Sequence, residues 1–166
     1  EAVDRGVAEL AALPKQDPGD ATEGERLNKL GLAALKAKNY TVAESLFRAA
    51  LNADPSVAKY FSNQGFAEMH VGNLISAEGH QYESLALDPY RSVAWGNLGS
   101  ILAKLERPED AVSALLVGYR VSEGATLGYL KSLDEDDDQR VRAVGKLSLE
   151  KLIVASSTAG SNGDTQ

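Results

Sequence analysis

The side chains best suited to acid–base or metal chemistry lie together in residues 68–80, EMHVGNLISAEGH. This stretch contains the chain's two histidines, His70 and His80, together with Glu68 and Glu78. A zinc-dependent hydrolase of the HExxH type needs two histidines four residues apart on one helix, so that both imidazoles reach one ion. The stretch lacks that spacing, and the chain has no cysteine that would supply a thiolate ligand. A metal-dependent hydrolase is therefore the least favoured function, and we expect no metal and no other cofactor.

An acidic run, DEDDD at residues 134–138, raises the alternative of calcium binding. A calcium loop alternates its oxygen ligands around an invariant glycine, and this run has neither feature. We interpret the run as the solvated start of a helix. The chain also lacks a glycine-rich phosphate loop and a nucleophile elbow, so no catalytic residues are predicted.

Three cationic or titratable side chains, Lys36, His70 and Lys104, recur at one fixed interval. A cation near the end of a helix is favoured by the helix dipole, by about 0.3–1 kcal/mol, and this structural role is preferred over ligand binding. The constant interval points to an element of fixed length that repeats along the chain.

The same interval, about 34 residues, separates the residues that shape the backbone. It separates Pro55 from Pro89 and Phe61 from Trp95, and it relates two series of three residues: Gly31, Gly65 and Gly99, and Ala43, Ala77 and Ala111. Two antiparallel helices with their turns need about this length, and small residues mark where the two helices cross closely. The Asp-Pro pairs predict the ends of the second helices, since proline cannot continue a helix.

These residues resemble the signature of the tetratricopeptide repeat family, whose period is about 34 residues. The matching residues are Leu27, Leu30, Gly31, Ala43, Phe47, Ala50 and Pro55 in repeat one (24–57), Phe61, Gly65, Ala77 and Pro89 in repeat two (58–91), and Trp95, Leu98, Gly99, Leu102, Ala111 and Leu115 in repeat three (92–125), where Glu123 replaces the proline. The resemblance covers about 100 of the 166 residues. It implies an all-α fold, a right-handed α-solenoid of three helical hairpins.

Segments on both sides of the repeats are predicted from periodicity and turn residues. Residues 1–23 combine a short amphipathic helix, with Val3, Val7 and Leu10 on one face, and a linker, PKQDPGDA. Thr22 is expected to cap the first helix of repeat one. Residues 126–155 are interpreted as a degenerate helical pair that caps the solenoid, with a loose likeness to a HEAT-type repeat, and residues 156–166 as a flexible tail.

Composition limits the classes of partner. With 43% hydrophobic and 25% charged residues the chain is ordinary, and its net charge of −7 disfavours nucleic acid and anionic membrane surfaces. No apolar run is long enough for direct membrane insertion. The compartment is undetermined between cytoplasm and bacterial periplasm, because the absence of cysteine fits both. The chain begins at Glu1 rather than Met, so we expect a processed or excised piece.

The resemblance implies that the first helix of each repeat lines a concave groove that holds an extended or helical peptide of a partner protein. An amide such as Asn63 or Asn97 can pair with a peptide backbone through both its donor and its acceptor. Lysines beside the groove would favour an acidic ligand. The predicted groove residues are Asn28, Lys29, Leu32, Leu35, Lys36, Lys59, Asn63, Phe66, Met69, His70, Asn97, Ser100 and Lys104, with Leu32, Leu35, Phe66 and Met69 as an apolar floor.

The best-known subclass of the family clamps a C-terminal carboxylate with lysine, asparagine and arginine side chains. The corresponding places in this chain hold Asn28, Leu32, Asn63, Val93 and Asn97, of which only Asn63 fits. The resemblance therefore disfavours a chaperone-tail receptor of that type.

Three polar residues of repeat two, Gln64, Glu68 and Gln81, occupy places where apolar residues usually pack between helices. Because buried polar groups are normally satisfied, we expect them to hydrogen-bond to one another and to Tyr82 or His80. The alternative is that repeat two is partly open and contacts a partner or a second copy of the chain.

The predicted function is that of a non-enzymatic adaptor, a monomer or weak homo-oligomer that binds a protein partner. The main alternative is a self-assembly module of a larger bacterial secretion, pilus or envelope complex. The amphipathic N-terminal segment, tethered by a short linker, is a candidate competitor for the groove in the free protein.

Overall fold

In the computed structural model of the protein, the backbone is described for residues 2–161 and the side chains for residues 5–155. Over this part of the chain every regular element is helical. The elements are α1 (Ala2–Ala11), α2 (Ala21–Lys36), α3 (Tyr40–Ala53), α4 (Ala58–Val71), α5 (Leu74–Leu87), α6 (Ser92–Lys104), α7 (Pro108–Val121), α8 (Glu123–Ser132), the 3₁₀ turn η1 (Leu133–Glu135) and α9 (Gln139–Ser161). The prediction of an all-α solenoid is confirmed.

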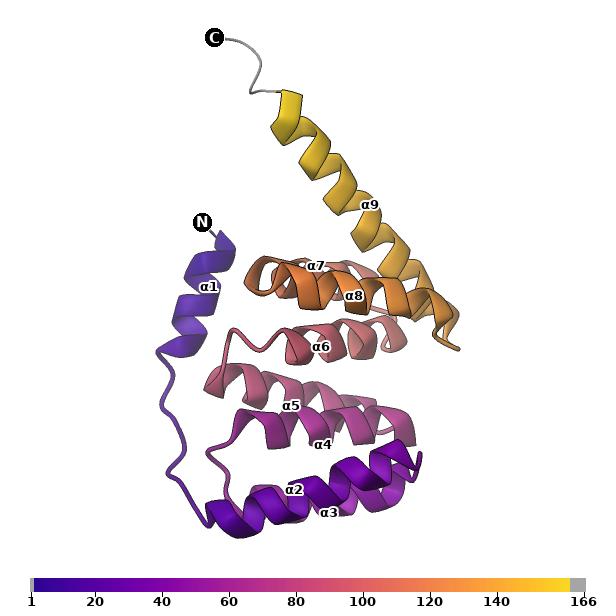
Figure 1. The fold of residues 1–166 in the computed structure, drawn as a ribbon. Helices are drawn as coiled ribbons and strands as arrows, with labels where there is room; N and C mark the ends of the chain where they lie inside the picture. The colour runs from indigo at the N-terminus through magenta and orange to yellow at the C-terminus, as the bar shows by residue number, and fades with distance from the viewer. Residues whose placement is uncertain (1, 162–166) are drawn as a thin grey trace.

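Three helical hairpins, α2–α3, α4–α5 and α6–α7, stack in chain order, and α8 continues the stack (Figure 1). The first helices contact one another in sequence, α2 with α4, α4 with α6, and α6 with α8. We call these four helices the first-helix layer. The long helix α9 packs on α6, α7 and α8 near its start and then runs away from the stack (Figure 1).

The helix ends follow the local chemistry of the sequence. Helices α3 and α5 end at Ala53 and Leu87, directly before the two Asp-Pro pairs, as expected. Helix α7 begins at Pro108, because proline is tolerated at the first helical position. The predicted cap of α2 was wrong. Asp20 is the N-cap, and its side chain accepts a hydrogen bond from the backbone N–H of Glu23 at 3.0 Å. Thr22 cannot cap because it already lies in the first turn.

The recurring glycines mark the closest approach of the two helices in each hairpin. A Cβ atom added at these positions would lie within 2.5–2.6 Å of a side chain on the second helix. The side chains that fill this space are Phe47 opposite Gly31, Gln81 opposite Gly65 and Leu115 opposite Gly99, and they recur at the same interval as the glycines. The sequence pointed to the alanines one turn earlier, and of these Ala77 and Ala111 contribute their carbonyl oxygens at 2.9 and 3.3 Å.

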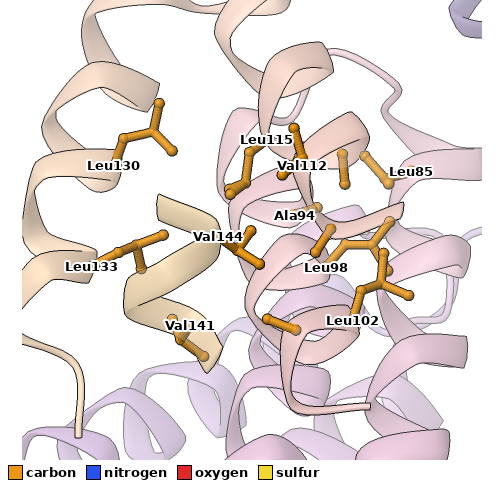
Figure 2. Packing of buried hydrophobic residues seen from close by; sticks show 13 residues of the cluster. Leu85, Ala94, Leu98, Leu102, Val112, Leu115, Leu130, Leu133, Val141 and Val144 are labelled. Carbon is orange, nitrogen blue, oxygen red and sulfur yellow. The ribbon is translucent and has the colours of Figure 1, made fainter. Parts of the chain in front are cut away.

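The largest hydrophobic cluster lies at the C-terminal end of the stack, between the third hairpin and the segment that follows it (Figure 2). Leu130, Leu133, Val141 and Val144, from α8, η1 and α9, face side chains of α6 and α7 such as Leu98, Val112 and Leu115. The segment after the repeats thus buries the last apolar face of the solenoid.

The N-terminal helix α1 lies beside the stack and packs against α5 (Figure 1). Val7 is 5% exposed, and Leu10 packs against the largest cluster. The proposed competition of this segment for the groove is therefore not seen, because its apolar face is occupied at α5. The side chain of Val3 lies outside the described residues.

The linker between α1 and α2 is held along the C-terminal ends of α3 and α5. Lys15 donates to the carbonyl oxygens of Ala86 and Leu87, which α5 leaves unpaired at its end. The backbone N–H of Gly19 donates to the Asp54 carboxylate at 3.1 Å. Hydrogen bonds from Ser56 and Gly19 lower the pKa of Asp54, and burial raises it by a smaller amount. This carboxylate therefore stays charged.

At the other end, α9 continues to Ser161, beyond the predicted boundary at residue 155. Residues 162–166 of the predicted flexible tail lie outside the described residues. None of the helices in the described part of the chain is long and apolar enough to span a membrane.

Candidate functional site

The four residues predicted to form an apolar floor differ in their exposure to solvent. Leu32 on α2 is 44% exposed, and Phe66 on α4 is partly exposed. Leu35 packs against the cluster of Ala43, Phe47 and Ala67. Met69 is only 8% exposed and packs with Ala77 and Ile101, so its flexible side chain serves the core.

The two amides predicted to bind a peptide backbone, Asn63 and Asn97, instead link neighbouring helices of the first-helix layer. Asn63 Nδ2 donates to Asn28 Oδ1 at 2.8 Å, and Asn97 Nδ2 donates more weakly to Ser62 Oγ at 3.4 Å. Asn28 and Asn97 are 2% and 4% exposed. Both contacts join residues 35 positions apart, so the amides hold consecutive repeats together. Of the three asparagines, Asn63 is the one that stays partly exposed.

The lysines of the predicted groove lie in different electrostatic surroundings. Lys59 Nζ is 2.6 Å from Glu25 Oε2, and Lys29 Nζ is 4.0 Å from the other oxygen of the same carboxylate. The hydrogen bond from Lys59 is the main cause that lowers the pKa of Glu25. Lys104 lies 3.8 Å from Asp136 and 3.5 Å from Asp138, so the acidic run after the repeats faces it. Lys36 is exposed at the end of α2.

His70 belongs to an aromatic group at the far end of α4. Its ring stacks on Tyr40, with centroids 4.2 Å apart and planes 7° apart, and meets Phe66 edge-on at 4.5 Å. Burial, followed by the charge of Lys104, lowers the pKa of His70. His70 is therefore neutral near pH 7, and the row of Lys36, His70 and Lys104 does not carry three charges.

Repeat two contains the predicted polar network. The Glu68 carboxylate is 3% exposed and accepts hydrogen bonds from Gln64 at 2.8 Å and Ser76 at 3.2 Å, with His80 Nδ1 at 2.7 Å. Burial raises the pKa of Glu68, but the hydrogen bonds from His80 and Gln64 outweigh burial and hold it below its usual value. The prediction of polar partners is confirmed for Glu68, which disfavours an open repeat two.

Gln81 is bonded outside this network, since its Nε2 donates to the carbonyl oxygen of Ser62 at 3.0 Å. The side-chain oxygens of Gln64 and Gln81 have no hydrogen-bond partner among the described residues. Tyr82, the other expected partner, is 45% exposed. Within the described part of the chain, no group of three or more His, Asp or Glu residues is arranged to hold a metal ion.

A pocket of about 320 Å³ lies between α6 and α8 and was not predicted from the sequence. Its lining residues are Ser92 and Val93 from α6, and Ala125, Thr126, Gly128, Tyr129 and Ser132 from α8. Tyr129 follows Trp95 by the repeat interval of 34 residues, although α8 begins directly after the end of α7. One glycine of the sequence bears on this pocket: Gly96 precedes the predicted groove residue Asn97, and the absence of a side chain there allows the Tyr129 ring to approach.

No family model matches the chain. Among curated proteins, it is 27% identical over 146 residues to the small glutamine-rich tetratricopeptide repeat-containing protein 2 of Mycosarcoma maydis, and 24% identical over 119 residues to the SGT1 homolog of Oryza sativa subsp. japonica. The alignments cover 88% and 72% of this chain. The chain spans only 38% and 32% of the length of these relatives.

Solved structures share the fold. The Sgt2 TPR domain from Aspergillus fumigatus has a TM-score of 0.63 and 23% identity, covering 87% of this chain and 88% of that domain. The first TPR domain of Spaghetti (RPAP3), bound to the HSP90 peptide SRMEEVD, has a TM-score of 0.65 and 15% identity, covering 83% and 99%. The Arabidopsis OM64 TPR domain has a TM-score of 0.64 and 17% identity, covering 78% and 97%. The repeat period, the stacked hairpins and these similarities together show that the chain has the fold of tetratricopeptide repeat domains.

Proposed function

We propose that this chain is a non-enzymatic adaptor that binds a peptide or helix of a partner protein on its first-helix layer. The observation that carries the proposal is the exposure of large apolar side chains on this layer. Leu32 on α2 and Val93 on α6 are 44% and 55% exposed, and Phe66 on α4 is partly exposed between them in the chain. A partner that covers these side chains removes apolar surface from water.

The charge of the first-helix layer on α2 and α4 supports an acidic ligand. The groove residues of α2 and α4 include three lysines, Lys29, Lys36 and Lys59, against the single carboxylate of Glu25. The whole chain carries a net charge of −7, so this surface differs in sign from the average of the molecule. Solved TPR domains similar to this chain were determined with acidic peptides, SRMEEVD of HSP90 and SGPTIEEVD of HSP70.

The details of recognition must nevertheless differ from a carboxylate clamp. Leu32 and Val93 occupy two of the clamp places and have no polar atoms to offer a carboxylate. Asn28 and Asn97 occupy two others and are buried, with Asn28 bonded to Asn63 and Asn97 to Ser62. We therefore propose that the ligand is an acidic internal segment, and that its C-terminal carboxylate adds little to the affinity.

Fluorescence anisotropy with labelled SRMEEVD and SGPTIEEVD, each with a free or amidated C-terminus, tests the proposal. We expect both to bind, with amidation changing the dissociation constant less than about twofold, and Leu32→Ser weakening binding about tenfold because it removes apolar contact. Ile75→Ser is the matched control, since Ile75 is 73% exposed on α5, outside the first-helix layer. Equal effects of the two substitutions would place the binding surface elsewhere.

Self-assembly is the second candidate. It is favoured by a pocket of about 570 Å³ between α7 and α9, whose lining includes Leu116, Val117 and Leu152. A pocket with apolar side chains and a rim that includes Arg120 and Glu123, beside a helix that runs away from the stack, suits a contact between copies of the chain. Light scattering across a dilution series distinguishes the two candidates, because a constant monomer mass contradicts self-assembly and leaves the adaptor proposal intact.

A further inference from the structure

We propose that the pocket between α6 and α8 is an anchor subsite, which receives one large apolar side chain from an acidic peptide segment. This inference rests on the proposed function, because it assigns a specific role to one part of the same surface. The pocket wall is apolar or small where a ligand side chain would enter: Val93 from α6, and Ala125, Gly128 and Tyr129 from α8.

The pocket is built by the packing of Tyr129. Its hydroxyl lies 2.7 Å from Ser100 Oγ, and a Cβ atom at position 96 would lie only 2.9 Å from the ring. Gly96 therefore lets the ring lie against α6, and Ser100 fixes its direction. Burial is the main cause that raises the pKa of Tyr129 to about 12, so the phenol stays neutral. The ring is a rigid, uncharged wall before any ligand arrives, which reduces the ordering cost of binding.

This junction differs from the other two in the first-helix layer. Asn63 and Asn28 bridge α4 to α2, and Asn97 and Ser62 bridge α6 to α4. Between α6 and α8, the hydrogen bond of Ser100 with Tyr129 joins the helices toward the end of α6, and the pocket opens beside the start of α6 at Ser92 and Val93. The pocket thus lies at the end of this junction that the hydrogen bond does not close.

Size and charge define the occupant. A volume of about 320 Å³ is enough for one large aliphatic or aromatic side chain. Val93 is the second residue of repeat three, the place that Lys59 holds in repeat two, so the pocket lies in the same row of the first-helix layer. Leucine or phenylalanine fits the apolar wall, and the acidic flanking residues follow from the proposed function, whose lysines lie on α2 and α4 of the same layer.

Two glycines of α8 allow a matched test. A Cβ atom at Gly128 or at Gly124 meets nothing within 4 Å, so both Gly128→Leu and Gly124→Leu should fold, as circular dichroism and thermal melting can verify. Only Gly128 lines the pocket, and a leucine there would occupy it. The probes are labelled nonapeptides SDEEXEEDS, acetylated and amidated, in which X is leucine, phenylalanine, alanine or lysine.

We expect the wild-type protein to bind the leucine and phenylalanine probes at least about tenfold more tightly than the alanine probe, because the pocket buries the larger side chain. Gly128→Leu should abolish that difference, and Gly124→Leu should preserve it. If the wild type binds the leucine and alanine probes equally, or if Gly128→Leu keeps the difference, the subsite is refuted while the adaptor proposal stands. If the wild type binds none of the probes, nor SRMEEVD or SGPTIEEVD, both proposals fail.

Discussion

Glu68 shows what a charged residue needs in order to replace an apolar one inside a helical repeat. Its carboxylate is buried between α4 and α5, and Gln64, Ser76 and His80 lie at hydrogen-bond distance from it. A buried carboxylate without such partners would be strongly destabilising. The network therefore stabilises the charged form, and the pKa of Glu68 lies below its ordinary value despite the burial that opposes this.

A pH dependence follows for Glu68. Because its pKa is lower in the folded than in the unfolded protein, the network contributes stability above the ordinary value of 4.5 and loses it as pH falls through the folded value. Glu68→Gln should cost about 1–3 kcal/mol at pH 7, since hydrogen bonds to charged groups are the stronger ones. Between about pH 5 and pH 3, the free energy of unfolding of Glu68→Gln should fall less steeply than that of the wild type.

Urea denaturation at several pH values measures both effects. Glu109→Gln, at an exposed position on α7, is the control and should change the free energy of unfolding at pH 7 by less than about 0.5 kcal/mol. An unchanged acid slope in Glu68→Gln would show that the network does not stabilise the charged carboxylate.

At the scale of helices, the fold depends on how closely the two members of each hairpin cross. In the second hairpin the crossing is polar, because Gly65 on α4 faces Gln81 on α5. A Cβ at position 65 would lie 2.5 Å from Gln81 Nε2 and 2.9 Å from the Ala77 carbonyl oxygen. The side chain of Gln81 could move, but the backbone of α5 could not without shifting the whole helix.

Gly65→Leu should therefore destabilise the protein by about 1–3 kcal/mol through overpacking. Gly79→Leu on the same α5 helix is the matched control, because a Cβ there meets nothing within 4 Å. Leucine favours helix over glycine, so this control should be neutral or slightly stabilising. Urea denaturation compares the two variants, and equal free energies of unfolding would contradict the close crossing.

The place where helix α1 packs could not be predicted from its sequence. Its amphipathic pattern was visible in the sequence, but the pattern does not state which surface it covers. The structure places Val7 and Leu10 beside α5 and the largest cluster, and the following linker is tied to the ends of α3 and α5. The N-terminal segment thus extends the solenoid core sideways and leaves the first-helix layer uncovered.

At the scale of the whole molecule, charge is unevenly distributed. The net charge is −7, yet the exposed Lys36 and Lys29 lie on α2 in the layer proposed to bind an acidic ligand. Exposed charges act mainly on the rate of encounter, and salt screens them over about 10 Å at 0.1 M. Apolar contacts such as that of Leu32 govern dissociation more than association.

Lys36→Glu should therefore slow association of labelled SRMEEVD by about tenfold or less at low salt, with little change in the dissociation rate. The difference from wild type should largely vanish at high salt. Lys151→Glu on α9 changes the net charge equally and serves as the control. Stopped-flow fluorescence gives both rates, and an equal effect of the two substitutions would mean that net charge, not the proposed surface, steers the peptide.

The sequence by itself determined the architecture of this protein, because that information is local or periodic. Proline after aspartate ends a helix wherever it stands, and a period of about 34 residues requires a repeating hairpin. The polar partners of Glu68 were also predictable, since His80 follows on the next helix and a buried carboxylate must be satisfied.

Only the tertiary structure decided which polar and charged side chains remain open to a ligand. Whether Asn28, Asn97, Met69 and Lys104 face solvent depends on the rotation of each helix against its neighbours and on the segment after the repeats. The pocket beside Tyr129 could not be predicted for the same reason: its walls come from two helices, α6 and α8, whose packing the sequence does not state. A one-dimensional period specifies which positions are equivalent, but the surroundings of each copy are set by contacts between distant segments.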